Sequence, residues 1–168
     1  MSRFCCAIPG PKGDTGEIFA RYGSFYSLQD QHYAQNTPTA MEFEITDLSN
    51  GVSITNNALG RPTRISFDNL GVYNIQFSAQ IAKTGANDTI DIWLMKNNQN
   101  VVWSDTSVYI QTSSQKFVAA WNFMLPLNAG DYFEIAWSSA LSTMELLAQT
   151  ASAPAPAIPS VIITVQSV

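Results

Sequence analysis

FDNLGVYNIQFSAQI, residues 67–81, is the stretch that decides the fold of this chain. From Tyr73 to Ile81 every second residue is apolar, which is the period of a strand that lays one face on a hydrophobic core. The residues between them are amides and a serine, and none is charged. A strand face in contact with solvent usually carries charges that discourage association between sheets. We therefore expect a long central strand whose second face lies against another protein subunit.

Two further segments repeat this pattern. Residues 116–127 and 161–166 alternate in the same way, and after Lys116 their second faces carry no charge. The alternating segments around Asp91 and Glu134 differ, because their second faces are charged. We predict an all-β, antiparallel sandwich in which the charged sheet faces solvent and the uncharged sheet faces sister subunits. The predicted subunit interface consists of Asn74, Gln76, Ser78, Val118, Ala120, Asn122, Met124, Ile162, Thr164 and Gln166.

The other strands are predicted from short alternating runs between turn residues. No stretch shows the apolar spacing of an amphipathic helix. The expected elements are a first strand within residues 24–33, a half-exposed strand at 41–45, turns at 47–51 and 97–100, a strand near 101–103, and an extended Pro/Ala-rich loop at 148–159.

The composition narrows the class of partner. Charged residues make up 12% of the 168 residues, about half of the roughly 25% typical of soluble domains. Such a chain exposes neutral polar side chains or buries much of its surface in an assembly. The net charge of -5 and the lack of a basic stripe argue against a nucleic-acid partner. No run has the length of a signal-peptide core or a membrane span, so we expect no membrane partner.

Residues 1–23 are predicted to form an extended N-terminal arm ahead of one domain at residues 24–168. Arg3 and Phe4 are candidate anchoring residues of this arm. Cys5 and Cys6 are adjacent, so they fit neither a disulfide framework nor a zinc site. We interpret them as small side chains packed within the anchoring arm, with lipidation or bridging between subunits as alternatives.

A glycine repeat follows these residues. Residues 10–18 carry glycine at every third position, as the crowded axis of a collagen triple helix requires. The three glycines are Gly10, Gly13 and Gly16. We predict a short collagen-like segment that depends on the domain for trimerisation, with a glycine-rich linker as the alternative.

Titratable residues give little sign of chemistry. The single histidine, His32, lies in a polar stretch without a nucleophile motif, so we interpret it as a surface or interface residue. Asp88 and Asp91 are interpreted as turn-capping residues, because the loop lacks the carboxylate density of an EF-hand, with calcium binding as the alternative. Glu42 and Glu44 share a strand face and are interpreted as solvated. The sequence predicts no enzyme, no catalytic residue, no metal site and no cofactor.

The tryptophans differ in their phase along the predicted strands. Trp121 and Trp137 are in phase with core residues. Trp93 and Trp103 are not, so we expect them to be surface aromatics that could stack on sugars.

Three motifs resemble the C1q/TNF-like jelly-roll family. They are FDNLGVYNIQF at 67–77, IWLMKNNQNVV at 92–102 and FMLPLNAGDYFEI at 123–135, and the resemblance spans residues 24–168. Four sequence segments are similar to versions of this domain carried by bacteriophages: SNGVSI, YNIQFSAQIAKTG, VAAWNFMLPLNAGDYFEIAWSS and PAPAIPSVIITV. The resemblance implies a homotrimer with the uncharged sheet at its threefold axis.

From these features we expect a homotrimeric structural protein located in the virion. Its arm would bind the major capsid protein or another virion protein, and its domain would form a capsid cement or decoration knob. The alternative is the receptor-binding knob of a tail or head fibre, an adhesin that binds glycans on the host surface. A capsid role is favoured because the chain is too short to make a shaft. A small hydrolase that uses His32 is the weakest hypothesis.

Overall fold

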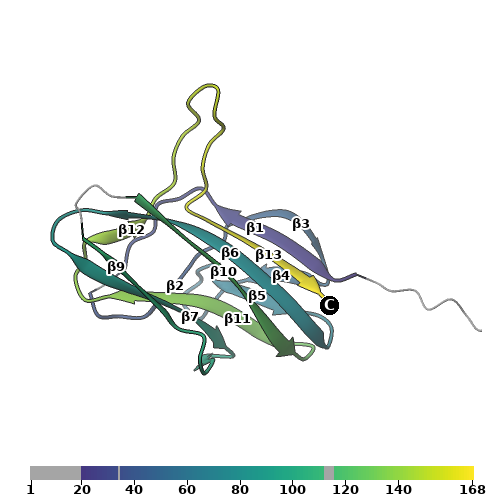
Figure 1. Ribbon diagram of the computed structural model, residues 1–168. Helices are drawn as coiled ribbons and strands as arrows, with labels where there is room; N and C mark the ends of the chain where they lie inside the picture. Colours follow the sequence, from purple (N-terminus) through teal and green to yellow (C-terminus); the bar gives the residue numbers. More distant parts are fainter. Residues whose placement is uncertain (1–19, 34, 112–115) are drawn as a thin grey trace, which may run out of the picture.

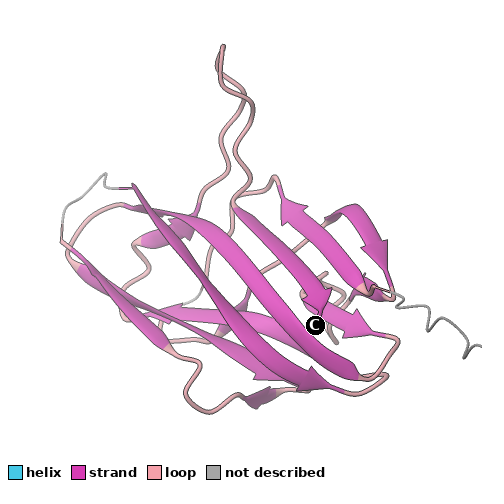
Figure 2. Ribbon diagram, turned by 45° about the vertical axis from the view of Figure 1, so that its right-hand side comes forward, coloured by secondary structure: helices cyan, strands magenta, loops and turns pink. Residues whose placement is uncertain are grey.

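The computed structural model describes residues 20–33, 35–111 and 116–168. Over these residues the chain forms strands and loops without a helix, and the strands build two antiparallel sheets packed face to face (Figure 1, Figure 2). The predicted all-β antiparallel sandwich is therefore confirmed. The part of the chain that the structure describes also has no helix that could span a bilayer.

Sheet A contains the stretch that decides the fold. Its strand order is β10-β6-β13-β1-β3, with β12 paired to the C-terminal end of β6. The strands are β10 (Lys116–Leu127), β6 (Gly71–Lys83), β13 (Val161–Ser167), β1 (Tyr22–Ser27), β3 (Ile45–Asn50) and β12 (Met144–Leu146). The C-terminal strand lies inside this sheet, between β6 and β1, as its apolar sequence predicts.

Sheet B contains the strands with charged second faces. Its order is β4-β5-β11-β7-β8, with β2 paired to β11 and β9 paired to β7. The strands are β4 (Val52–Thr55), β5 (Arg64–Phe67), β11 (Tyr132–Ser139), β7 (Asp88–Lys96), β8 (Gln99–Asn100), β2 (Thr39–Ala40) and β9 (Thr106–Ile110). The predicted separation of charged and uncharged strands into two sheets is thus observed.

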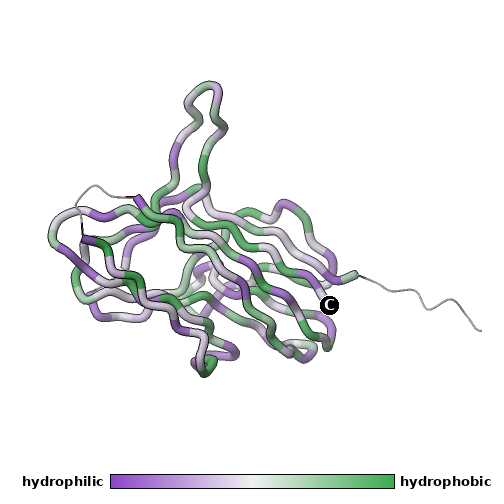
Figure 3. Tube along the Cα trace, in the orientation of Figure 1, coloured by the Kyte–Doolittle hydropathy of each residue, from purple (hydrophilic) through white to green (hydrophobic). Residues whose placement is uncertain are grey.

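The core lies between the sheets and follows the period of two. Figure 3 shows apolar and polar residues alternating along the strands. Tyr73, Ile75 and Phe77 of β6 point inward and are at most 4% exposed. From the opposite sheet, Phe67 packs its ring 4.4 Å from that of Tyr73. Burial of each such side chain stabilises the fold by about 1.5–3 kcal/mol, so the alternation fixes which face of β6 turns inward.

Two local predictions, the strand at 41–45 and the turn at 47–51, were wrong. Residues 41–44 lie outside any strand, although Met41 and Phe43 are fully buried; the backbone N–H of Met41 donates to the carbonyl of Ile135 at 2.8 Å, and that of Phe43 donates to the carbonyl of Pro62. The predicted turn at 47–51 lies mostly within β3, and only Gly51 has a left-handed φ of 69°. The pairing of β3 with β1 contains a bulge at Ser24 and Phe25, which breaks the alternation that sequence reasoning depends on.

The predicted strand near 101–103 is a turn. Trp103 has a left-handed φ of 65°, and the hydroxyl of Ser104 donates to the carbonyl of Val101 at 2.8 Å. The predicted Asn-rich turn at 97–100 is confirmed in part, because Asn97 and Asn98 both have φ above zero and Gln99 already belongs to β8. The chain therefore reverses once, at Asn97 and Asn98, and the turn at 101–104 separates β8 from β9, which both run antiparallel to β7.

The Pro/Ala-rich segment forms a long loop that rises from the body between β12 and β13 (Figure 1). Two isolated bridges hold its sides together, Gln149 to Ile158 and Ser152 to Ala155. Its root is fixed where the amide of Ala148 donates to the Asp30 carboxylate at 2.8 Å. Residues 150–157 are all exposed and uncharged.

Candidate functional site

The ten residues predicted to form a subunit interface lie together on the outer face of sheet A. The register places Asn122 beside Gln76 and Gln76 beside Thr164, so that one row crosses β10, β6 and β13. A parallel row joins Ala120, Ser78 and Ile162. A third joins Met124, Asn74 and Gln166, and Val118 extends the face beside Gln80. Whether this face meets other subunits stays a prediction.

The structure extends the same rows onto a fourth strand that sequence reasoning missed. Tyr22, Ser24 and Tyr26 of β1 lie opposite Gln166, Thr164 and Ile162. The signal was present in the sequence, since these three polar or aromatic residues alternate with Gly23 and Phe25. It was missed because β1 begins at Tyr22, before the predicted domain boundary at residue 24. We call the three rows on β10, β6, β13 and β1 the uncharged face.

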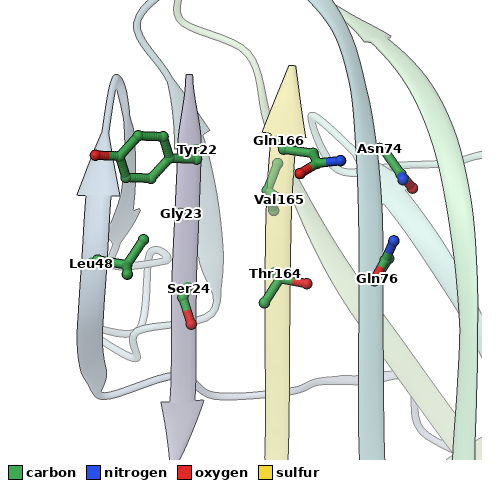
Figure 4. Close-up of a pocket in the computed structure, with 9 residues that line it drawn as sticks. All are labelled: Tyr22, Gly23, Ser24, Leu48, Asn74, Gln76, Thr164, Val165 and Gln166. Carbon is green, nitrogen blue, oxygen red and sulfur yellow. The ribbon is translucent and has the colours of Figure 1, made fainter. Parts of the chain in front are cut away.

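A shallow hollow of about 300 Å³ lies in the uncharged face. Figure 4 shows the side chains of Tyr22, Gln166 and Asn74 along one side of it, and those of Leu48, Thr164 and Gln76 along the other. The lining is neutral, with amides, hydroxyls and two large hydrocarbon groups. Such a surface can form hydrogen bonds and apolar contacts without removing a charge from water.

Two buried polar atoms of sheet A lack partners within the described chain, one on the uncharged face and one on the core-facing side of the edge strand β10. The side-chain oxygen of Asn74 and the indole Nε1 of Trp121 are buried, and neither has a hydrogen-bond partner there. Buried polar groups are almost always paired, because an unpaired one costs about 1–3 kcal/mol. On the uncharged face, the side-chain oxygen of Asn74 is therefore left unsatisfied by the described residues of a single subunit.

Strand β10 forms the edge of sheet A and carries large aromatic rings there. Trp121 packs edge-on against Phe77 at 4.9 Å between ring centroids, and Phe123 stacks on Phe77 at 6.4 Å. Both outer rings remain partly exposed. A long edge strand with apolar side chains is a surface that proteins normally cover.

The titratable residues that the sequence offered as candidates for catalysis or metal binding form ion pairs and hydrogen bonds within the fold. The Nδ1 atom of His32 lies 3.6 Å from a carboxylate oxygen of Glu145, and the histidine is 69% exposed. Asp88 is buried and accepts hydrogen bonds from neighbouring hydroxyls and amides. Across the described ranges no group of three or more His, Cys, Asp or Glu residues is placed to hold a metal.

The interpretation of Glu42 as solvated was wrong, whereas Glu44 is exposed as expected. Glu42 pairs with the guanidinium of Arg61, and Glu44 accepts a hydrogen bond from the amide of Leu28 at 2.6 Å. Both partners come from segments distant in sequence, which single-strand periodicity does not reveal.

The tryptophans follow their predicted phases. Trp137 is fully buried in the core and Trp121 is partly buried at its edge. Trp103 is 97% exposed, and Trp93 is half-buried on the outer face of sheet B. The predicted arm residues Arg3, Phe4, Cys5 and Cys6 and the glycines Gly10, Gly13 and Gly16 lie outside the described residues and stay predictions.

Comparison with known proteins identifies the fold. No protein-family model and no curated protein matches the chain. The crystal structure of murine APRIL at pH 8.0 is similar, with a TM-score of 0.56 and 8% identity over 89% of this chain and 99% of that chain. The fold is a TNF-like jelly roll. The structure of Eiger TNF from S. frugiperda agrees, with a TM-score of 0.55 and 9% identity over 89% of this chain and 91% of that chain. Identities this low concern the fold alone, and on that level the resemblance found in the sequence is confirmed.

Proposed function

We propose that this TNF-like jelly roll is a homotrimeric structural protein of a bacteriophage virion, a capsid cement or decoration protein held by its N-terminal arm. The observation that carries the proposal is the uncharged face, which crosses four strands of sheet A without a charged side chain. The opposite sheet of the same sandwich carries Asp91, Glu134 and Arg64.

Trimerisation explains three features of the face at once. It would cover the apolar edge strand β10, supply a partner for the unpaired side-chain oxygen of Asn74, and remove the face from water without desolvating a charge. The low charge content of the whole chain, 12%, fits a subunit that buries much of its surface in an assembly.

The placement of the termini supports an anchoring role for the arm. Tyr22 and Gln166 are paired at one end of sheet A, and the long 148–159 loop rises from the other end (Figure 1). An arm that precedes Tyr22 would hold the domain at one end and leave the loop pointing away. The virion location itself is supported by the resemblance of the sequence to phage-borne versions of the fold.

Two measurements test the proposal. Multi-angle light scattering of the full chain should give three times the mass of a single chain, and a monomer would overturn the assembly. Intact capsids that lack the protein should retain the full chain in stoichiometric amounts after sedimentation, and a version without residues 1–19 should remain trimeric but fail to bind. Equal binding of both versions would show that the arm is not the anchor.

A further inference from the structure

The outer face of sheet B contains a second hollow, of about 400 Å³, built around two tryptophans. Its main lining residues are Asp91, Trp93, Asn100, Trp103, Asp105 and Ser138. Sheet B faces away from the uncharged face of sheet A, so assembly through sheet A would leave this hollow open to solvent (Figure 2). We call it the tryptophan hollow.

Strand register fixes the floor of the tryptophan hollow. Asp91 lies opposite Ser138 on β11 and opposite Ser107 on β9, so a carboxylate sits between two hydroxyls. Trp93 lies opposite Ala136, whose small side chain leaves room beside the indole. The indole Nε1 of Trp93 donates to the side-chain oxygen of Asn100 at 2.9 Å, which fixes the orientation of the ring.

The second indole is presented by a strained turn. Trp103 is 97% exposed and has a left-handed φ of 65°, a conformation that bulky residues rarely adopt. The next residue, Ser104, is buried, and its hydroxyl accepts a hydrogen bond from the amide of Leu94 at 3.0 Å. The turn is therefore held firmly while its largest apolar side chain stays in water. Such strain and exposure contribute nothing to folding, and both are typical of binding sites.

The polar groups around the indoles are hydrogen-bond acceptors. Burial raises the pKa of the Asp105 carboxyl, and the neighbouring charge of Asp91 raises it further. An ionised carboxylate only accepts hydrogen bonds, so Asp91 and Asp105 are suited to hydroxyl donors. Asn100 and Ser138 add an amide and a hydroxyl next to them.

We propose that the tryptophan hollow binds a neutral carbohydrate. The apolar C–H face of a pyranose ring would stack on Trp103, and its hydroxyls would donate to Asp91 and Asp105. Aromatic rings joined with a few placed polar groups form the usual lining of small-ligand sites. The two carboxylates would repel sialic and uronic acids. Several neutral hydrogen-bonding groups around the rings favour a polyhydroxylated ligand over a single cation. This inference does not rest on the proposed virion role or on the trimer.

The test uses the full chain on an array of oligosaccharides. The neutral probes end in glucose, galactose, mannose or N-acetylglucosamine, and the acidic probes end in sialic or uronic acid. We expect binding to at least one neutral probe and none to its acidic counterpart. Binding to acidic probes only, or to none, would overturn the proposal, and so would preferential binding of a lysine-rich peptide spotted on the same array.

Variants then locate the site. By titration calorimetry with the neutral probe that binds best, Trp103→Ala should weaken affinity about tenfold or more, and Trp103→Phe should recover part of the loss. Asp105→Asn should weaken binding without changing thermal stability. The matched control is Leu70→Ala, which removes a side chain that is 75% exposed but does not line the hollow. Unchanged affinity in Trp103→Ala would disprove the assignment. Light scattering of the same samples reports the trimer separately.

Discussion

At the scale of single residues, Asp88 joins the start of β7 to the loop after β11. One carboxylate oxygen accepts hydrogen bonds from the hydroxyl of Ser139, the amide of Leu141 at 3.1 Å and the hydroxyl of Thr143 at 3.3 Å. The other accepts from the amide of Thr89 at 2.8 Å. Burial raises the pKa of the nearby Tyr33 phenol, which therefore keeps its proton and donates to the carbonyl of Leu141. The carboxylate organises this end of the sandwich.

We predict that Asp88→Ala lowers the free energy of unfolding by about 3 kcal/mol, because buried donors lose their acceptor. Urea denaturation at a fixed protein concentration measures the loss. The matched control is Asp47→Ala, since Asp47 is exposed on β3, and it should change stability by less than about 0.5 kcal/mol. Equal effects of the two substitutions would contradict the structural role of Asp88.

Sequence reasoning could identify Asp88 as a capping residue but not as a buried one. Its acceptor role depends on Ser139, Leu141 and Thr143, which lie more than fifty residues away and reach it only once β7 pairs with β11. The Glu42–Arg61 pair escaped because its two residues lie nineteen positions apart in segments outside the strands, which only the folded chain brings together. Partners brought together by sheet pairing leave no local pattern.

At the scale of elements, alternation predicts a strand well where its two faces meet different surroundings. Strands β6, β10 and β13 satisfy this condition, and their register follows from it. The exposed edge strand β3 does not, because five of its six residues are exposed. The reversal at Asn97 and Asn98 and the turn at Trp103 depend on left-handed backbone conformations that no hydrophobic pattern encodes.

Also at the scale of elements, the turn at 128–131 is bound to the turn after β7 at the arm end of the sandwich. Asp131, in the turn between β10 and β11, accepts hydrogen bonds from the amide of Asn128 at 2.8 Å and from the side-chain amide of Asn97 at 2.8 Å, and it pairs with Lys96 at 2.8 Å. The hydrogen bond from Asn128, followed by those from Lys96 and Asn97, holds the pKa of Asp131 well below its usual range. The ionised form is therefore favoured by folding.

A depressed pKa gives stability that is present above the unfolded pKa of about 3.9 and is lost as pH falls toward the folded pKa. We predict that Asp131→Asn lowers the free energy of unfolding by about 1 kcal/mol at pH 7. The difference from the natural chain should shrink as the pH falls from about 5 to 2. Thermal melts across this range check it, with the exposed Asp68→Asn as control. A stability difference between variant and natural chain that stays constant with pH would show that the charge of Asp131 does not contribute.

At the scale of the whole molecule, charge placement says which sheet surface is available for assembly. The sequence could predict that β6, β10 and β13 share an uncharged face, because each strand shows it alone. It could not show that these strands are neighbours, that β1 continues their rows, or that Asn74 has an unpaired polar atom. Those properties exist only after the strands have paired, and together they favour a self-complementary surface.

The substitution Gln76→Glu tests that surface, because it replaces only the side-chain amide nitrogen by an oxygen. Gln76 lies at the centre of the uncharged face, between Asn122 and Thr164. We predict that Gln76→Glu weakens the trimer strongly, because assembly would bury an ionised carboxylate in each of three subunits, at a cost of several kcal/mol apiece. In light scattering over a dilution series, the variant should dissociate at concentrations where the natural chain stays trimeric. Burial raises the pKa of a glutamate, so a pH below about 4 should neutralise it and restore assembly. The matched control is Gln99→Glu, the same chemical change at an exposed position on β8. Its trimer should be as stable to dilution as that of the natural chain. A Gln76→Glu trimer of unchanged stability would mean that assembly uses a different surface.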